Sequence, residues 1–203
     1  MDIKNVLGNL TRRGFKPSYF ENRNEALDFI LDLIPKDASV GIGGSMTVKE
    51  LKLNKMLSDR GNVVYTHSLD VPLEQREQIY RLAGSANWYV SSTNALSEDG
   101  EFVNIDGTAN RISALAFGVK NVLYVLGTNK IAPDLAGAID RARNFSAPPN
   151  ARRCNKNTPC ATSGQCCFCD SDECICNATL ISHHPTGYQD NVYVVIIDET
   201  LGY

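Results

Sequence analysis

The sequence predicts an α/β domain with a mainly parallel, open sheet and helices on both faces. Stretches with helical periodicity alternate with short apolar strands along the chain, which is the order found in parallel sheets. The clearest strand, 121–126, is apolar almost throughout, as expected for a strand buried on both faces. A length of 203 residues is ordinary for one domain, so we expect residues 1–203 to form a single unit.

The beginning of the chain shows this alternation. Residues 2–14 predict a helix whose apolar residues share one face, and Gly14 ends it. A short strand is expected at 15–20. Asn22 then caps a second helix, which carries an apolar stripe and ends at Pro35.

A glycine-rich turn follows the next strand. Residues 38–42 predict a strand that runs into Gly41-Ile42-Gly43-Gly44-Ser45, and a helix follows with Thr47 and Glu50 as an expected capping box. Turns of this kind place backbone N–H groups where an anion can bind. The motif lacks the Gly-Lys-Ser/Thr of a phosphate loop, and Met46 stands at the last glycine of GxGxxG, so a plain tight turn is an equal alternative.

The rest of the chain continues the pattern with one interruption. Further strands are expected at 62–66, 87–93, 121–126, 179–182 and 192–198. Further helices are expected at 70–83, 106–117 and 133–144, the last of them broken by the proline-containing stretch 146–150. Asp99-Gly100 signals a hairpin at 98–105, which we expect at the rim of the sheet or at its active-site end.

Composition restricts the partners that the protein can have. A formal net charge of -3 gives no electrostatic reason to expect nucleic acid or an anionic membrane as a partner. No apolar run approaches the roughly 20 residues that span a bilayer, and the first residues lack the apolar core of a signal peptide. We therefore expect a cytoplasmic protein, and a homo-oligomer is compatible with the sequence.

All seven cysteines lie in a Cys-rich loop, 153–177, near the C-terminus. In a reducing compartment, clustered cysteines are more often metal ligands than disulfides. Two of them form a C-x2-C pair, a spacing that lets two thiolates reach one metal ion. The favoured ligand set for an iron–sulfur cluster is Cys160, Cys166, Cys169 and Cys176. The alternatives are zinc, with His183 or His184 supplying one ligand, and disulfides.

Polar residues also gather where strands end, and ligands of parallel α/β sheets bind beyond the carboxyl ends of the strands. The candidates for binding a small anion are Gly43, Gly44, Ser45, Asn94, Asp106, Gly107, Asn110 and Arg111. Arg111 suits a carboxylate or phosphate, and Glu98 or Asp106 is the candidate base, so these three are the catalytic candidates. The alternative is that Asp106-Gly107-Thr108 is only a turn and helix cap, which Arg111 ties to the hairpin.

Two motifs resemble a known family. The stretch 91–143 contains EDGxxVNxDGxxNR and resembles the signature half of the lactate-utilisation, or LUD-domain, family, whose glycine-rich turn GIGGSMTVKEL also matches. The Cys-rich loop and the ending VYVVIIDETLGY resemble a compact branch of that family. The resemblance implies the open α/β sheet of sugar-phosphate isomerases, CoA transferases and formyltetrahydrofolate cyclo-ligases.

The resemblance also implies a function, because better-known members of this family belong to a three-protein system that oxidises L-lactate. It implies a redox-linked protein of organic-acid metabolism that binds a small anionic ligand, carries or docks an iron–sulfur centre, and works with iron–sulfur oxidoreductase partners. Two other hypotheses stay open. One is a non-redox enzyme of the isomerase or acyl-transfer type with structural zinc, and the other is a non-catalytic partner subunit.

Overall fold

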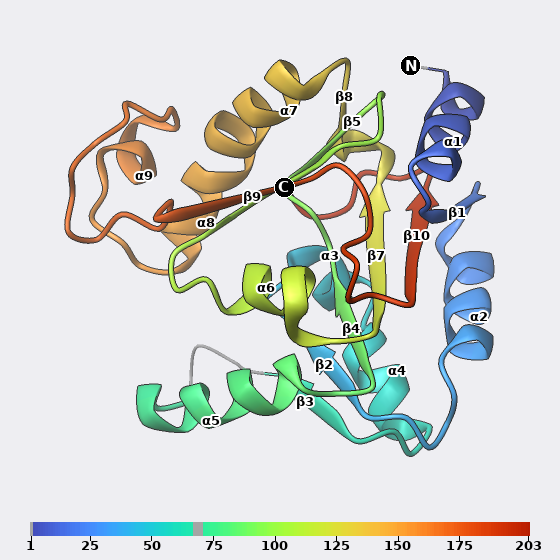
Figure 1. Cartoon of the computed structure of the whole chain (residues 1–203). Helices are drawn as coiled ribbons and strands as arrows, with labels where there is room; N and C mark the ends of the chain where they lie inside the picture. Colours follow the sequence, from blue (N-terminus) through green and yellow to red (C-terminus); the bar gives the residue numbers. More distant parts are fainter. Residues whose placement is uncertain (1, 67–70) are drawn as a thin grey trace.

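A parallel sheet forms the centre of the molecule (Figure 1). The structure, a computed structural model, describes residues 2–66 and 71–203. Within these residues six parallel strands pair in the order β1-β10-β7-β4-β2-β3. The strands are β1 (Lys16–Phe20), β2 (Val40–Ile42), β3 (Val64–Thr66), β4 (Trp88–Ser91), β7 (Asn121–Gly127) and β10 (Asn191–Ile197). The predicted parallel α/β sheet is confirmed.

Helices cover both faces of this sheet, as predicted. Leu123 and Val125 of β7 pack on one face with α2 (Arg23–Leu33), α3 (Met46–Glu50) and α4 (Leu53–Asp59). The intervening residues of β7 pack on the opposite face with α1 (Ile3–Arg12), α5 (Leu73–Gly84) and a π-helical turn (Ala114–Gly118). Side chains of a strand alternate between its faces, so each buried strand contributes to two cores.

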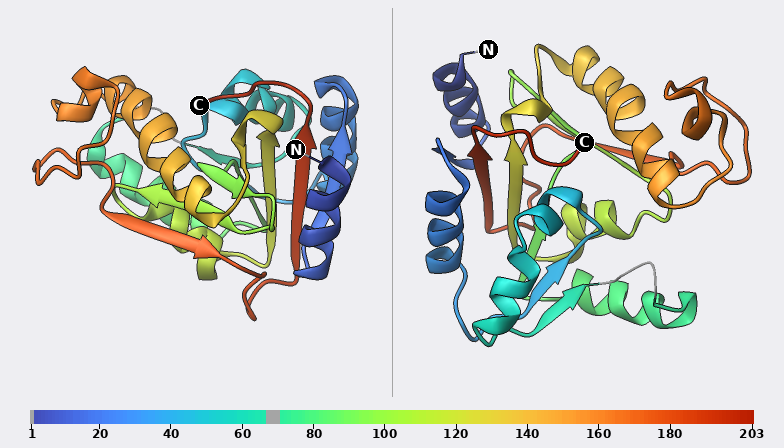
Figure 2. Two further views of the ribbon diagram at one scale, coloured as in Figure 1. Left: turned by 90° about the horizontal axis from the view of Figure 1, so that it is seen from above. Right: turned by 180° about the vertical axis from the view of Figure 1, so that it is seen from behind.

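A second, smaller sheet packs over the second face (Figure 2). Its strands pair in the order β8-β5-β6-β9. They are β5 (Ala95–Ser97), β6 (Phe102–Asp106), β8 (Ile131–Ala132) and β9 (Ala178–Ser182). Phe102 stacks on Tyr124 of the main sheet, with ring centroids 4.3 Å apart. The predicted hairpin therefore exists, with its two strands at the centre of a separate sheet and not at the rim of the main one. Asp106 at the end of β6 reaches the cleft described below, which fits the other expected position, the active-site end.

The helix expected at 133–144 does not end at the proline stretch. Asp134 caps α7 (Leu135–Arg141), which continues through a π-helical turn (Ala142–Ser146) into α8 (Ala147–Arg153). Pro148 and Pro149 lie in the first turn of α8, where backbone N–H groups are not needed for the helix. The expected break at 146–150 is therefore wrong, and it is this continuation that carries Arg153 to the site described below.

The expected capping box of α3 is also wrong. Ser45 caps this helix, because its Oγ accepts the backbone N–H of Val48 at 3.3 Å. Thr47 instead donates to the carbonyl oxygen of Leu201 at 3.2 Å, and Glu50 accepts the backbone N–H of Gly202 at 2.8 Å. These two contacts hold residues 201–203 against the carboxyl end of the main sheet.

The remaining helical segments are short. They are α6 (Asn110–Ser113), α9 (Pro159–Ser163) and a 3-10 turn (Thr128–Lys130). The expected start of the 70–83 helix at Asp70 lies outside the described residues. Among the residues that the structure describes, no helix combines the length and apolar character needed to cross a membrane.

Candidate functional site

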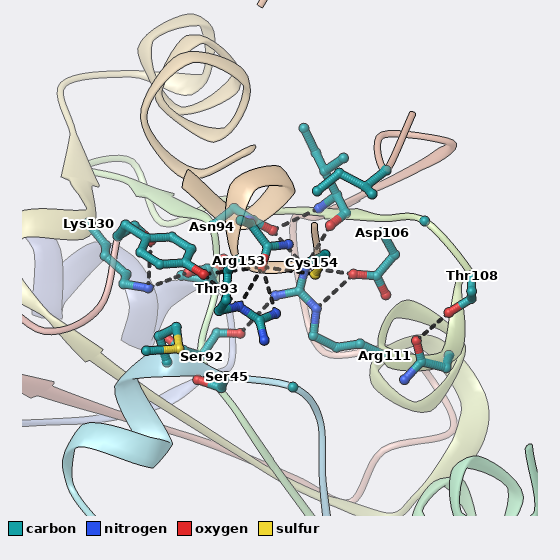
Figure 3. A pocket seen from close by; sticks show the side chains of 18 of the residues that line it. Ser45, Ser92, Thr93, Asn94, Asp106, Thr108, Arg111, Lys130, Arg153 and Cys154 are labelled. Atoms are coloured by element: carbon teal, nitrogen blue, oxygen red, sulfur yellow. Dashed lines mark hydrogen bonds and ion pairs between the residues drawn. The ribbon is translucent and has the colours of Figure 1, made fainter. Parts of the chain in front are cut away.

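A cleft of about 210 Å³ opens at the carboxyl ends of the main-sheet strands (Figure 3). Its walls come from the segments that follow β2, β4, β6 and β7, and from the end of α8. These distant segments meet because parallel strands all end at the same edge of a sheet. The charged side chains of the lining are three cations, Arg111, Lys130 and Arg153, and one carboxylate, Asp106.

Arg111 is tied into the protein through all the nitrogens of its guanidinium. Nε and Nη2 donate to Asp106 Oδ1 at 2.9 and 2.7 Å, Nη2 donates to Asn94 Oδ1 at 2.7 Å, and Nη1 donates to the carbonyl oxygen of Ser92 at 3.3 Å. Asp106 Oδ2 accepts the backbone N–H of Ile112 at 2.9 Å. Only 14% of the arginine and 9% of the aspartate side chain are exposed. The pair therefore joins α6 to β6 and to the segment after β4.

Ser92 carries a buried hydroxyl that is not satisfied. The residue is 3% exposed and lines the cleft. Its Oγ has no hydrogen-bond partner among residues 2–66 and 71–203. A buried polar atom without a partner costs about 1–3 kcal/mol. The hydroxyl therefore marks a position where a polar atom of a bound molecule would be stabilised.

Lys130 is a buried amine, only 4% exposed, that lines the cleft. Its Nζ donates to the carbonyl oxygens of Thr93 and Tyr203, each at 3.2 Å. No Asp or Glu side chain pairs with it in the described part of the chain. Burial, together with the positive charges of Arg141 and Arg111, lowers the pKa of Lys130 to about 7.

Arg153 borders the cleft at the end of α8. Its Nε donates to Tyr203 Oη at 2.8 Å and to Asn150 Oδ1 at 3.1 Å, and its Nη2 donates to Asn150 Oδ1 at 2.7 Å. Its Nη1 has no hydrogen-bond partner, and no carboxylate pairs with it, among the residues described. A guanidinium in this state can bind a carboxylate or phosphate with two parallel hydrogen bonds.

Most of the predicted anion-binding residues meet in this cleft. They are Gly44, Ser45, Asn94, Asp106, Gly107, Asn110 and Arg111. Gly43 lies just outside the lining, where an added Cβ would come 2.9 Å from Tyr89 Oη. Glu98 does not line the cleft; it follows β5, and its carbonyl oxygen accepts from Asn9 of α1 at 2.7 Å. Asp106 has both carboxylate oxygens engaged, so its contacts fit the turn-and-cap alternative.

Sequence reasoning missed the two cations that lack carboxylate partners. Lys130 follows the apolar strand 121–126 closely, so the strand-end rule that pointed to Gly43 and Asn94 applies equally to it. Arg153 offers no comparable signal. It belongs to a helix that the sequence does not predict, and that helix is what brings it to the cleft.

A second pocket, which we call the cysteine pocket, lies in the Cys-rich loop. It has a volume of about 160 Å³ and is lined by Cys160, Cys166, Cys167, Cys169, Cys174 and Cys176. All four favoured ligands are in this set. The loop extends beyond α8 and β9 (Figure 1). Asn144 Oδ1 ties it to the body by accepting the backbone N–H of Cys166 at 3.0 Å.

The thiols of the cysteine pocket lie close enough to influence one another. Burial, together with the neighbouring Cys174, Cys166 and Cys160, raises the pKa of Cys176 to about 12. Within the described chain, however, no group of three or more Cys, His, Asp or Glu side chains has the geometry to hold a metal ion. The donor set suits a thiolate-bound metal, although these neighbouring side chains are not gathered around one point. His183 and His184 do not line this pocket; His184 Nδ1 lies 3.0 Å from the carbonyl oxygen of Arg13.

One short segment separates the cleft from the cysteine pocket. Ile175 lines the cleft, whereas its neighbours Cys174 and Cys176 line the cysteine pocket. Ile175 packs on Gly107, where an added Cβ would lie 3.4 Å from its Cα. Cys154 is the exception among the cysteines, because it lines the cleft.

Comparisons with known proteins agree on the fold and the family. The structure is similar to a crystal structure of a DUF162 family protein from Deinococcus radiodurans, with a TM-score of 0.55 and 8% sequence identity over 96% of this chain and 95% of that chain. An identity this low supports the fold alone. No curated protein matches the sequence. The profile of the LUD domain matches residues 3–197, nearly the whole sequence, and this match shows that the chain belongs to the LUD-domain family.

Proposed function

We propose that this LUD-domain protein binds a small organic anion in the cleft and acts in organic-acid utilisation, with L-lactate as the first candidate. One observation carries the proposal: Lys130 and Arg153 line the cleft, and no Asp or Glu side chain pairs with either within the described chain. Removing cations from water without a counter-charge costs free energy, which an anionic ligand offsets. The unsatisfied hydroxyl of Ser92 supports the proposal independently.

The shape of the site favours a small ligand. Pockets for drug-sized molecules usually measure about 300–1,000 Å³, and this cleft measures about 210 Å³. Arg153 provides the planar fork that matches a carboxylate, and Ser92 provides a hydroxyl for a neighbouring oxygen. A short 2-hydroxy acid has a carboxylate for Arg153 and a neighbouring oxygen for Ser92. The L-lactate system implied by the family resemblance uses a substrate of this class.

Calorimetric titration of the purified protein tests the proposal. We expect saturable binding of L-lactate or pyruvate, with inorganic phosphate and a sugar phosphate as competing anions. Arg153→Gln should weaken binding about 10- to 100-fold, because a charge-assisted hydrogen bond contributes about 1.5–3 kcal/mol. Arg152→Gln is the matched control, since Arg152 is the exposed neighbour on the same helix and does not line the cleft. Binding of none of these anions to the wild type would contradict the proposal.

We propose a second role for the cysteine pocket, which is to hold an iron–sulfur cluster ligated by Cys160, Cys166, Cys169 and Cys176. The observation in its favour is that six of the seven cysteines line this one pocket. Thiolates are the usual ligands of such clusters. A bound cluster supplies one-electron transfer, which fits work beside iron–sulfur oxidoreductase partners in lactate oxidation.

Anaerobic purification followed by iron, sulfide and zinc analysis tests this second role. Brown protein with iron and sulfide in equal amounts is the expected result. Cys169→Ser should lose the iron, and Cys154→Ser should retain it, because Cys154 lines the other pocket. Colourless protein with one zinc per chain would favour the non-redox enzyme with structural zinc. Metal-free protein that co-purifies with another subunit and has no turnover alone would favour the non-catalytic partner.

A further inference from the structure

Lys130 stands out because a lysine is seldom buried without an Asp or Glu side chain beside it. It ends the 3-10 turn Thr128–Lys130 after β7, and its amine is directed by two carbonyl oxygens, those of Thr93 and Tyr203. The first of these acceptors is an uncharged peptide group, and the second is the main-chain oxygen of the last of the 203 residues. Neither the fold nor any ion pair in the described chain explains why this position carries a charged residue type, whereas exposed lysines such as Lys55 pair with carboxylates.

The groups that face the amine favour its neutral form. Arg111 in α6 and Arg141 at the end of α7 are cations close enough to lower the pKa of Lys130. The carboxylate of Glu50 in α3 acts in the opposite direction and raises it. Burial is the largest effect and acts with the arginines. The resulting pKa of about 7 leaves a large share of the amine unprotonated at neutral pH.

The hydrogen bonds of the amine leave its reactive electrons available. A neutral amine has two N–H groups and one lone pair. The two N–H groups are accounted for by the carbonyl oxygens of Thr93 and Tyr203. The lone pair is then the part of Nζ that no neighbour occupies, and Lys130 lines the cleft. Desolvation and nearby cations are the usual means by which a lysine becomes a nucleophile.

The cleft also provides groups for the rest of a carbonyl substrate. Tyr203 contacts both Lys130, through its carbonyl oxygen, and Arg153, through its hydroxyl, so the amine and the guanidinium border the same space. Arg153 can hold a carboxylate. The buried, unpartnered Oγ of Ser92 can donate to an oxygen that gains negative charge during addition.

We propose that Lys130 forms an imine with a small 2-oxo acid whose carboxylate is bound by Arg153. The inference rests on the proposed anion-binding function and specifies the ligand class of that site. The lone pair of Nζ forms a bond to the carbonyl carbon, and the carbonyl oxygen takes up one amine proton. Loss of this hydroxyl with the second amine proton, as water, leaves the C=N bond. No oxidant or reductant is needed. A 2-hydroxy acid binds the same site without forming this bond.

Reductive trapping tests the proposal on the full-length wild-type protein. Pyruvate is the probe, sodium borohydride reduces any imine, and mass spectrometry locates the adduct. We expect a single addition equal to the mass of pyruvate less one oxygen atom, in the peptide that contains Lys130. Lys130→Met should abolish the adduct, and Lys120→Met should retain it, because Lys120 is an exposed lysine outside the cleft. L-lactate should give no adduct.

The outcomes separate this inference from the function on which it rests. Calorimetric binding of pyruvate without an adduct at Lys130 would overturn the imine and leave the anion site standing. Adducts spread over exposed lysines would overturn it as well. Failure of both pyruvate and L-lactate to bind would overturn the anion site. Peptide mapping of the wild type decides the question even where Lys130→Met fails to fold.

Discussion

The cleft and the cysteine pocket lie on opposite sides of the segment 174–176, yet the chain builds them in different ways. In the cleft, Arg111 alone makes hydrogen bonds to four other residues, and the walls are the ends of buried strands. In the cysteine pocket, the thiols sit on a short helix and irregular turns, and they do not converge on a common point.

The cleft is therefore the site that is already formed before its ligand binds. The cleft is held by the fold, so a ligand that enters it has little ordering to do, which favours affinity. The cysteine pocket holds suitable donors in an open arrangement, and a metal would have to draw them together. Metal binding of that kind contributes to the stability of the segment itself.

The strongest test of the cleft as a prebuilt site is removal of the buried carboxylate. Asp106→Ala should lower the free energy of unfolding by about 3–5 kcal/mol, because it leaves the guanidinium of Arg111 nearly buried without a counter-charge. Urea denaturation measures this loss. Glu77→Ala is the control, since its pair with Arg81 is exposed and should contribute under about 0.5 kcal/mol. Equal losses in both variants would mean that the cleft pair is not special.

The buried amine should make stability depend on pH. The folded pKa of Lys130, about 7, lies below its value of roughly 10.4 in the unfolded chain. Between these values the unfolded chain binds the extra proton, so stability should rise with pH from about 7 to 10 by on the order of a few kcal/mol. Lys130→Met should remove this rise. Unfolding curves of both proteins measured at several pH values check it, and parallel profiles would contradict the assignment.

The wall between the sites can be tested from the cleft side. Gly107→Val should cost about 1–3 kcal/mol, because its branched side chain must displace Ile175, whereas Gly107→Ala fits at ordinary contact distance. Thermal unfolding measures the difference between the two variants. The same valine should weaken ligand binding in the cleft and metal retention in the cysteine pocket. An effect on neither site would show that the wall is not shared.

The cysteine pocket should respond least when no metal is present. Cys169→Ser in metal-free protein should change the free energy of unfolding by less than about 0.5–1 kcal/mol, because this thiol is only half-buried. The same substitution should abolish metal retention. Urea denaturation beside metal analysis gives both quantities. A large loss in the metal-free state would place this pocket with the cleft, as a site that the fold already requires.

The main sheet could be predicted from the sequence because its strands are apolar on both faces and its helices have caps. Asn22, for example, caps α2 as predicted. The second sheet could not. The hairpin and the strand 179–182 can be recognised as segments, but β8 has only two residues and β6 pairs with β9 across more than seventy residues, so no local pattern shows that these strands form a sheet of their own. The proline break failed because Pro148 and Pro149 stand at a helix start, where proline is tolerated.

The candidate site, too, could be predicted from the sequence only in part. The positions of Asn94, Asp106 and Arg111 in the cleft follow from strand ends, which a sequence reveals. Their mutual engagement does not, because hydrogen-bond partners depend on how β6 and α6 are set against each other. The pairing left Arg111 satisfied and Lys130 and Arg153 as the cations without carboxylate partners among the described residues. A sequence cannot show which of several cations finds a partner.

The segment 174–176 has a thermodynamic consequence for the two sites. Cys174 and Cys176 face one pocket and Ile175 faces the other, so a displacement of this backbone changes both. Where one ligand changes the affinity for another, the second must change the affinity for the first by the same factor. A ligand bound in the cleft would then raise or lower the affinity of the thiols for a metal. The fraction of protein that carries metal would depend on the concentration of the cleft ligand.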